Sequence, residues 1–187
     1  DYINLGIQKS RQLEYVKGLM QMQYLKAITY NEIESYDDAI LYFQKAVKNA
    51  EVLQDSGYLR FCYMNIGVIN LNIENYEQAK KDFFVSLKYA NNSYTKSIGI
   101  YNYLGTLYKE LGIFDSSFYY HNKNLKLKEI ENDTLGFARS FNNIALVYKH
   151  IGDYKKALEY LNKSLKFKKK MNATKGIGGS YINTPLF

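Results

Sequence analysis

An internal repeat of about 40 residues limits this chain to a small set of folds. A small residue recurs at intervals of 40, 38 and 40 residues, at Ala27, Gly67, Gly105 and Ala145. The same kinds of side chain follow it each time: an aromatic nine residues later, a small residue twelve later and an aliphatic residue twenty later. Four such copies are typical of a stack of repeated units, because one unit cannot bury its apolar face without its neighbours.

Each repeat has the pattern of two helices joined by a short turn. Apolar residues recur at helical spacing, as in Tyr154, Leu158 and Leu161. Turns at 73–75 and 111–113 separate a first helix, which holds the small residue, from a second helix, which begins near the aromatic residue. The single proline lies near the end of the chain, so the repeats lack the strongest helix breaker. We therefore predict an all-α, right-handed superhelical solenoid of antiparallel helix pairs.

The repeats extend over nearly the whole chain. We predict a single solenoid domain spanning 1–187, with repeats at about 18–57, 58–95, 96–135 and 136–175 and partial repeats at 1–17 and 176–187. Pro185 holds the position of the small residue in the last partial repeat, and proline disfavours a helix interior. Either the helical stack or the chain itself is therefore expected to stop there.

The cysteine, the histidines and the sequence motifs give no indication of a catalytic site, a metal site or a cofactor. Cys62 is the only cysteine, which excludes a disulfide within the chain and a zinc site built from several cysteines. His121 and His150 lie in different repeats and do not form the i, i+4 pair of a metal-binding helix. We find no glycine-rich phosphate loop and no pairing of a nucleophile with a base, so we predict that the protein is not an enzyme. Cys62 and His121 are interpreted as packed core residues.

Charge and hydropathy narrow the choice of partners only in part. The net charge is +7, which is compatible with an acidic partner or with nucleic acid. The one dense basic run consists of Lys163, Lys166, Lys168, Lys169, Lys170 and Lys175. We interpret this run as the solvated outer face of a second helix, with nucleic-acid binding as the alternative, and we expect no specific nucleic-acid partner. No apolar run reaches the roughly 20 residues that span a bilayer, so no transmembrane segment is predicted.

The repeats resemble the tetratricopeptide repeat. The matching residues are Leu104, Gly105, Tyr108, Gly112, Phe114 and Leu125 in repeat three, and Ala145, Tyr148, Gly152, Tyr154, Ala157 and Leu165 in repeat four. The period exceeds the family's usual length of about 34 residues, which lengthens the helices and the turns. The stretches 63–67 and 141–145 are most similar to the long repeats in the sensory regions of Bacteroidetes-type histidine kinases and regulators.

The resemblance implies a binding module. Its ligand would be a protein or peptide held in the concave groove of the first helices, within the ligand-sensing or protein-interaction region of a larger bacterial signalling protein. A freestanding adaptor or scaffold protein is the alternative, and a basic solenoid that contacts nucleic acid is a third hypothesis. The compartment is left open between the bacterial cytoplasm and periplasm.

We predict the ligand groove from the positions at which first helices face the inside of such a stack. The candidate residues are Tyr24, Phe61, Met64, Asn65, Leu71, Asn102, Lys109, Arg139, Asn142, Asn143 and Lys149. The groove is expected to be apolar in repeat two and polar to basic in repeats three and four. The resemblance implies that Asn65 and Asn143 hold the ligand backbone, since an amide both donates and accepts hydrogen bonds. Alternatively, these asparagines bond neighbouring helices, and Phe61 and Met64 pack between helices.

Overall fold

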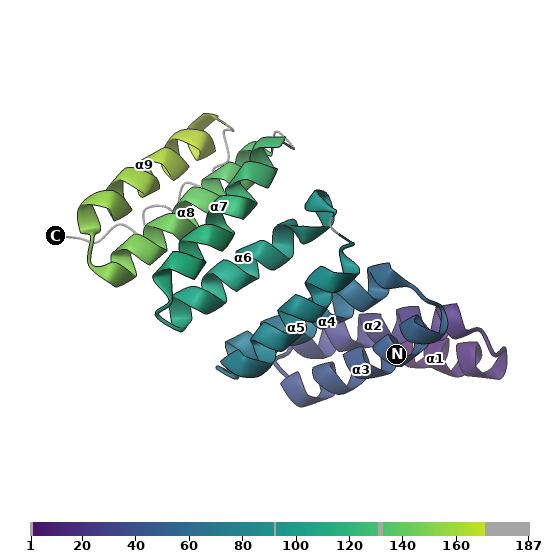
Figure 1. Cartoon of the computed structure of the whole chain (residues 1–187). Helices are drawn as coiled ribbons and strands as arrows, with labels where there is room; N and C mark the ends of the chain where they lie inside the picture. The colour runs from purple at the N-terminus through teal and green to yellow at the C-terminus, as the bar shows by residue number, and fades with distance from the viewer. Residues whose placement is uncertain (1, 92, 131–132, 171–187) are drawn as a thin grey trace. The chain divides into compact units, whose positions relative to one another are not determined.

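A computed structural model describes residues 2–91, 93–130 and 133–170 of the chain. Within these residues the chain forms nine α-helices and no strand (Figure 1). The helices are α1 Tyr2–Gln12, α2 Val16–Glu32, α3 Tyr36–Val52, α4 Ser56–Asn72, α5 Tyr76–Tyr89, α6 Tyr94–Glu110, α7 Phe114–Ile130, α8 Thr134–Ile151 and α9 Tyr154–Lys170. The prediction of an all-α solenoid built from antiparallel helix pairs is confirmed.

Contacts divide the chain into two compact units, Asp1–Ser93 and Tyr94–Phe187, here called unit 1 and unit 2. In unit 1, α2 pairs with α3 and α4 pairs with α5, while α1 packs against α2 and α3 against α4. In unit 2, α6 pairs with α7 and α8 pairs with α9, while α7 packs against α8. Each pair comprises a first helix, a short turn and a second helix. The partial repeat predicted at 176–187 lies outside the described residues.

The small residue of each repeat lies where the two helices of a pair approach closely. Ala27 is fully buried. A Cβ atom added at Gly67 would lie 2.7 Å from the ring of Phe83, and one added at Gly105 would lie 2.6 Å from the imidazole of His121. A larger side chain at either glycine would therefore force the two helices apart.

Buried polar side chains tie the second helices to neighbouring first helices. Ser86 on α5 donates to the backbone carbonyl of Arg60 on α4 at 2.8 Å, and Ser164 makes the equivalent bond from α9 to α8 at 2.7 Å. Both serines follow the small residue of their repeat by nineteen positions. Asn124 on α7 holds this position in repeat three, and its longer side chain donates to Ser140 on α8 at 3.0 Å.

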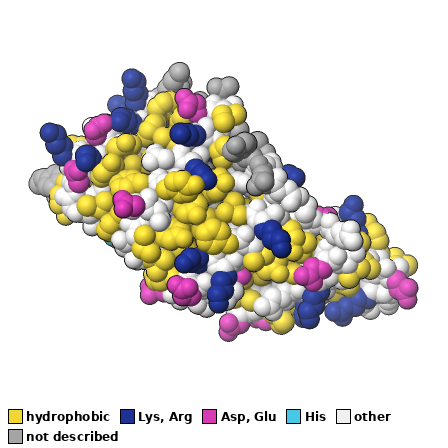
Figure 2. All heavy atoms as spheres, viewed as in Figure 1, with side chains coloured by type: hydrophobic (Ala, Val, Ile, Leu, Met, Phe, Trp, Pro, Cys, Tyr) yellow, Lys and Arg dark blue, Asp and Glu magenta, His cyan; other side chains and the backbone are white. Residues whose placement is uncertain are grey.

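Tyrosine pairs fill the junction between the first and second helix in three of the four repeats. The pairs, with the distances between their ring centroids, are Tyr30–Tyr42 (5.5 Å), Tyr108–Tyr120 (5.4 Å) and Tyr148–Tyr160 (5.4 Å). In each pair, the first ring follows the small residue by three positions and the second ring follows it by fifteen. Figure 2 shows hydrophobic side chains, tyrosine included, over much of the viewed face of unit 2.

Lys168 corrects the interpretation of the basic run as a solvated face. Its side chain is only 8% exposed, and burial lowers its pKa, with the nearby charge of Arg139 adding to this effect. Lys168 follows the small residue of its repeat by twenty-three positions, where repeats one and two have the fully buried Ala50 and Ala90. The packing of the repeat therefore buries the hydrocarbon stem of this lysine in spite of its charge. Lys175, the last lysine of the run, lies outside the described residues.

Candidate functional site

Three of the predicted groove residues come together in unit 2. Asn102 on α6 and Arg139 and Asn143 on α8 line a cavity of about 350 Å³, which α7 completes. The other lining residues are Ile98, Gly99, Asn124, Lys128, Asp133 and Gly136. We call this cavity the α6–α8 groove. The first helices α6 and α8 and the second helix α7 line it together.

The two asparagines of the α6–α8 groove are bonded to each other. The Nδ2 atom of Asn143 donates to Oδ1 of Asn102 at 2.6 Å. This bond uses one N–H of Asn143 and one lone pair of Asn102, and each amide has further donor and acceptor capacity. The bond links α6 to α8 and thereby fixes the positions of two amides in the wall of the groove.

The equivalent asparagine of unit 1 makes the same kind of contact. Asn65 on α4 donates to the backbone carbonyl of Phe61 at 2.8 Å and to the hydroxyl of Tyr24 on α2 at 3.4 Å. Asn65 and Tyr24 are 41 residues apart in sequence, the same separation as Asn143 and Asn102. In both units, the asparagine that was predicted to hold a ligand thus contacts the preceding first helix, which is the alternative that the sequence left open.

The α6–α8 groove also contains a buried amide, that of Asn124 on α7. Asn124 is 4% exposed, and its nitrogen donates to Ser140, but its oxygen Oδ1 accepts no hydrogen bond from the described residues. Folded proteins leave few buried carbonyl oxygens unpaired, because an unpaired one costs roughly 1–3 kcal/mol. The oxygen is therefore a candidate acceptor for an N–H group of a ligand. Asn124 is not among the residues predicted from the sequence, although the sequence holds a signal for it: asparagine stands where the other repeats have Ala or Ser.

Charged side chains give the α6–α8 groove its polarity. Lys128 forms an ion pair with Asp133 at 2.8 Å, and Asp133 also caps α8 by accepting from the backbone N–H of Gly136 at 2.8 Å. The hydrogen bonds from Lys128 and Gly136 lower the pKa of Asp133, so its carboxylate is ionised at neutral pH. Arg139 is exposed in the same groove, which therefore offers one cation beyond the ion pair.

The other predicted residues of unit 2 do not line this groove. Lys109 forms an ion pair with Glu110 at 2.7 Å. Asn142 is half-buried, whereas Lys149 is exposed. The basic face predicted from Lys109, Arg139 and Lys149 is therefore represented in the groove by Arg139 alone.

The predicted residues of unit 1 form a more apolar surface. Tyr24 packs edge-on against Phe43, with ring centroids 5.6 Å apart. Phe61 is 39% exposed, and the guanidinium group of Arg60 lies 3.9 Å from the centroid of its ring. Met64 and Leu71 are half-buried. A ligand role for these side chains stays a prediction.

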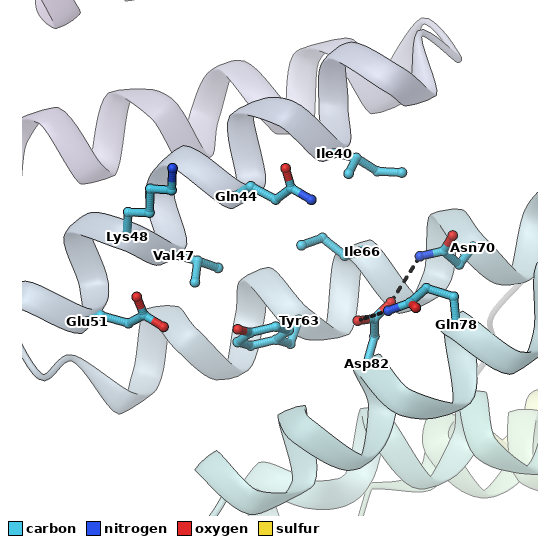
Figure 3. A pocket seen from close by; sticks show the side chains of 10 residues that line it. All are labelled: Ile40, Gln44, Val47, Lys48, Glu51, Tyr63, Ile66, Asn70, Gln78 and Asp82. Carbon is cyan, nitrogen blue, oxygen red and sulfur yellow. Dashed lines mark hydrogen bonds between the residues drawn. The ribbon is translucent and has the colours of Figure 1, made fainter.

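A second cavity, which the sequence did not predict, lies in unit 1 between α3, α4 and α5 (Figure 3). Its volume is about 490 Å³. The lining residues are Ile40, Gln44, Val47, Lys48 and Glu51 of α3, Tyr63, Ile66 and Asn70 of α4, and Gln78 and Asp82 of α5. We call this cavity the α3–α5 pocket. Two second helices bound it, whereas two first helices bound the α6–α8 groove.

A buried carboxylate forms part of the wall of the α3–α5 pocket. Asp82 is 5% exposed and accepts hydrogen bonds from Nδ2 of Asn70 at 2.9 Å and from Nε2 of Gln78 at 3.0 Å, both drawn in Figure 3. Burial raises the pKa of Asp82, while the two hydrogen bonds and the charge of Lys81 act in the opposite direction. Both bonded donors are neutral amides, so each oxygen accepts one hydrogen bond and the charge is not neutralised.

Two of the groups considered for catalysis and metal binding, His121 and Cys62, are packed in the core, whereas His150 is exposed. His121 is 1% exposed, and burial, followed by the charge of Lys109, lowers its pKa to about 4. Cys62 is fully buried, and burial raises the pKa of its thiol to about 12. The interpretation of both as core residues is confirmed. Among the described residues, no three His, Cys, Asp or Glu side chains are grouped so that they could hold a metal ion. The described helices also include none with the length and apolarity of a membrane span.

Solved structures resemble this chain at low sequence identity. BtubC from P. vanneervenii is 20% identical with a TM-score of 0.74, and the match covers 84% of this chain and 66% of that one. MamA is 21% identical with a TM-score of 0.63, covering 88% and 95%. The apo form of RapI is 13% identical with a TM-score of 0.76, covering 97% of this chain and 52% of RapI. At such identities the likeness concerns the fold alone.

Family models, unlike these solved structures, identify the repeat family. Models described as tetratricopeptide repeat match residues 21–52 in unit 1 and residues 97–170 in unit 2. A comparison with curated proteins finds no match. The family generally binds proteins or peptides. Tetratricopeptide repeats are thus found in both compact units, at residues 21–52 of unit 1 and at residues 97–170 of unit 2.

Proposed function

We propose that this chain is a protein- or peptide-binding module and that it serves as the ligand-sensing or interaction region of a larger bacterial signalling protein. The α6–α8 groove is its binding site. The observation that supports this choice is the buried oxygen of Asn124, which accepts no hydrogen bond from the described residues and lies in the same cavity as the amides of Asn102 and Asn143.

An extended peptide supplies the groups that suit this groove. A backbone N–H of the peptide donates to Oδ1 of Asn124, and peptide carbonyl and N–H groups meet the remaining amide atoms of Asn102 and Asn143. An acidic side chain of the peptide lies toward Arg139, whose charge is exposed. Binding needs no covalent step, because the affinity arises where these bonds exceed the cost of ordering the peptide.

The groove is tested with a peptide selected from a random library displayed on phage. The enriched peptide is labelled with fluorescein, and its Kd for the full chain is measured by fluorescence anisotropy. Asn124→Ser is expected to weaken binding by about 1 kcal/mol or more, since it removes the buried acceptor, and it should fold because serine holds this position in two other repeats. Asn143→Ala should have a similar effect, and Arg139→Ala should weaken binding mainly at low salt.

Asn162→Ala provides the matched control, since Asn162 is an exposed asparagine on α9 outside the groove. This variant is expected to bind the peptide as the unmodified chain does. Unchanged Kd values for Asn124→Ser, Asn143→Ala and Arg139→Ala would exclude the α6–α8 groove as the site.

The signalling role is tested by sequencing the reading frame that encodes the chain. We expect its reading frame to continue into a transmembrane segment and a kinase domain, or into another signalling domain. A reading frame that encodes only these repeats would instead favour the freestanding adaptor.

A further inference from the structure

The α3–α5 pocket exists because repeat two breaks the rule of paired tyrosines. The positions three and fifteen residues after the small residue hold two tyrosines in repeats one, three and four. In repeat two they hold Asn70 and Asp82, which bond to each other at 2.9 Å and are each 5% exposed. Two aromatic rings are thus replaced by two short polar side chains, and less of the junction between the helices is filled.

The corresponding junction of unit 2 shows what the pocket lacks. There, Phe118 of α7 lies 4.7 Å from Tyr148 of α8, measured between ring centroids, and Tyr148 stacks on Tyr160 of α9 at 5.4 Å. The equivalents in unit 1 are Ile40, Asn70 and Asp82, and all three line the pocket of about 490 Å³. Three rings that close the junction in unit 2 are therefore replaced by side chains that leave it open.

The charge at the junction is reversed as well. In unit 2, the ammonium group of Lys156 lies 5.2 Å from the ring centroid of Tyr148. Its equivalent in unit 1 is the neutral Gln78, which donates to Asp82. No Lys or Arg of the described chain forms an ion pair with Asp82, although the charge of Lys81 reaches it. A buried carboxylate without an ion-pair partner is an unusual arrangement, since burying a charge is costly.

The walls of the α3–α5 pocket suit a long side chain that ends in a cation. Ile40, Val47 and Ile66 provide apolar surface for an aliphatic stem, and the ring of Tyr63 offers its face to a cation (Figure 3). The carboxylates of Glu51 and Asp82 raise the pKa of the Tyr63 hydroxyl, after burial itself, so both negative charges are felt inside the pocket. Lys48 on the α3 side is exposed and balances only one of these charges.

We propose that the α3–α5 pocket binds the guanidinium group of an arginine side chain presented by a partner protein. Each oxygen of Asp82 accepts one hydrogen bond from within the chain and has a second lone pair, which a planar guanidinium can reach with two parallel N–H groups. The choice of a protein partner rests on the proposed function, but the site lies on the second helices and is separate from the α6–α8 groove.

The test is a nuclear magnetic resonance titration of the full chain with N-acetyl-arginine methylamide, which imitates an arginine within a polypeptide. The side-chain amide signals of Asn70 and Gln78 report on the pocket, because both groups bond Asp82. We expect saturable shifts of these signals. N-acetyl-citrulline methylamide has almost the same shape without the charge, and it should bind at least about tenfold more weakly. The lysine analogue should also bind more weakly, since an ammonium group cannot form the two parallel bonds.

Two variants separate recognition from folding. Asp82→Asn removes the charge and keeps the shape, so the shifts caused by the arginine probe should require at least about tenfold higher concentration. The double variant Asn70→Tyr with Asp82→Tyr restores the pair seen in the other three repeats and should abolish the shifts, now followed on Tyr63, while the chain stays folded by circular dichroism. Glu77→Gln, at an exposed acidic position of α5, removes the same charge outside the pocket and should leave the titration unchanged.

Several outcomes would overturn the proposal: no saturable shift at millimolar arginine probe, equal binding of the citrulline or lysine analogue, or binding that survives Asp82→Asn. Tighter binding of free arginine than of the capped probe would also overturn it, since this would indicate a small-molecule site. Asn143→Ala in the α6–α8 groove should not affect the titration. Failure of the peptide selection and failure of the arginine titration can therefore be told apart.

Discussion

His121 holds the place that Phe43 and Phe83 fill in unit 1, sixteen residues after the small residue. An imidazole is as flat as a phenyl ring, so the close approach to Gly105 is kept. It also brings two ring nitrogens into the core, and Nδ1 has no hydrogen-bond partner among the described residues. Burial of the ring, followed by the charge of Lys109, disfavours protonation, and the pKa of His121 falls from 6.5 to about 4.

This depressed pKa predicts a loss of stability in acid. Between pH 6.5 and about 4 the unfolded state binds more protons at His121 than the folded state does, so the stability of unit 2 should fall as the pH falls through this range. We expect the free energy of unfolding to be about 2 kcal/mol lower at pH 5 than at pH 7 from this group. Urea titrations followed by circular dichroism at both values measure it.

His121→Phe is the comparison that isolates the effect, because phenylalanine already fits this position in two repeats. The variant should lose this part of the pH dependence. Asp82, whose pKa is raised, contributes with the opposite sign in both proteins and cancels in the comparison. An identical loss of stability at pH 5 with and without His121 would show that the imidazole is not responsible.

At the level of the helices, a residue with a left-handed backbone follows each of the four first helices within two residues of its end. These residues are Glu34, Glu74, Gly112 and Gly152, with φ values of 59°, 60°, 70° and 84°. The next residue donates back into the last turn, as Asn75 does to the carbonyl of Asn70 at 2.8 Å. Glycine adopts this backbone without strain, whereas a residue with a Cβ atom pays roughly 1–2 kcal/mol.

Glu74→Gly is therefore expected to stabilise unit 1. Relief of the strained backbone exceeds the extra entropy that glycine gives the unfolded chain, so a net gain of about 0.5–1 kcal/mol is expected in urea unfolding. Gly152→Ala serves as the reverse control and should destabilise unit 2 by a similar amount. A lower urea midpoint for Glu74→Gly than for the unmodified chain would contradict this account.

The helix pairs could be predicted because the same helix–turn–helix pattern occurs in each repeat. The expected turns at 73–75 and 111–113 are the gaps between α4 and α5 and between α6 and α7. Asn102 and Asn143 could be placed on one surface because they lie three and two residues before the small residues of successive first helices, so the repeat brings their helix turns side by side. Offsets from the small residue capture the features that all repeats share. They therefore predict the fold, which depends on those shared features.

The features that the sequence analysis missed are departures from the repeat. Asn124 replaces a small residue, and Asn70 and Asp82 replace a pair of tyrosines. The structural effect of each replacement depends on the contacts that the neighbouring side chains lose. Lys168 was misplaced for a different reason. A charged side chain predicts exposure, but the position of Lys168 in the repeat is that of the buried Ala50. Position in the repeat is thus a better guide to burial here than side-chain charge.

For the whole molecule, the net charge of +7 raises the question of nucleic acid. Several described lysines already contact carboxylates: Lys109–Glu110, Lys128–Asp133, Lys156–Asp153 and Lys163–Glu159. Lys168 is only 8% exposed, so it presents little of its side chain to a partner. Over α6 and α7, the Lys and Arg side chains in Figure 2 lie apart from one another between hydrophobic ones. Such a surface lacks the continuous basic stripe that is typical of nucleic-acid-binding proteins.

We therefore expect DNA and RNA to bind weakly and without sequence preference. Binding by scattered phosphate contacts releases counterions, so raising the salt concentration from about 50 mM to about 200 mM should remove most of it. Fluorescence anisotropy of a labelled duplex and of a labelled single strand, each paired with a shuffled sequence of the same composition, measures both properties. The shuffled sequences should bind equally well. A Kd that differs strongly between a sequence and its shuffled control, and that survives the higher salt concentration, would make the basic solenoid that contacts nucleic acid the better hypothesis, because only base contacts distinguish sequences of equal charge.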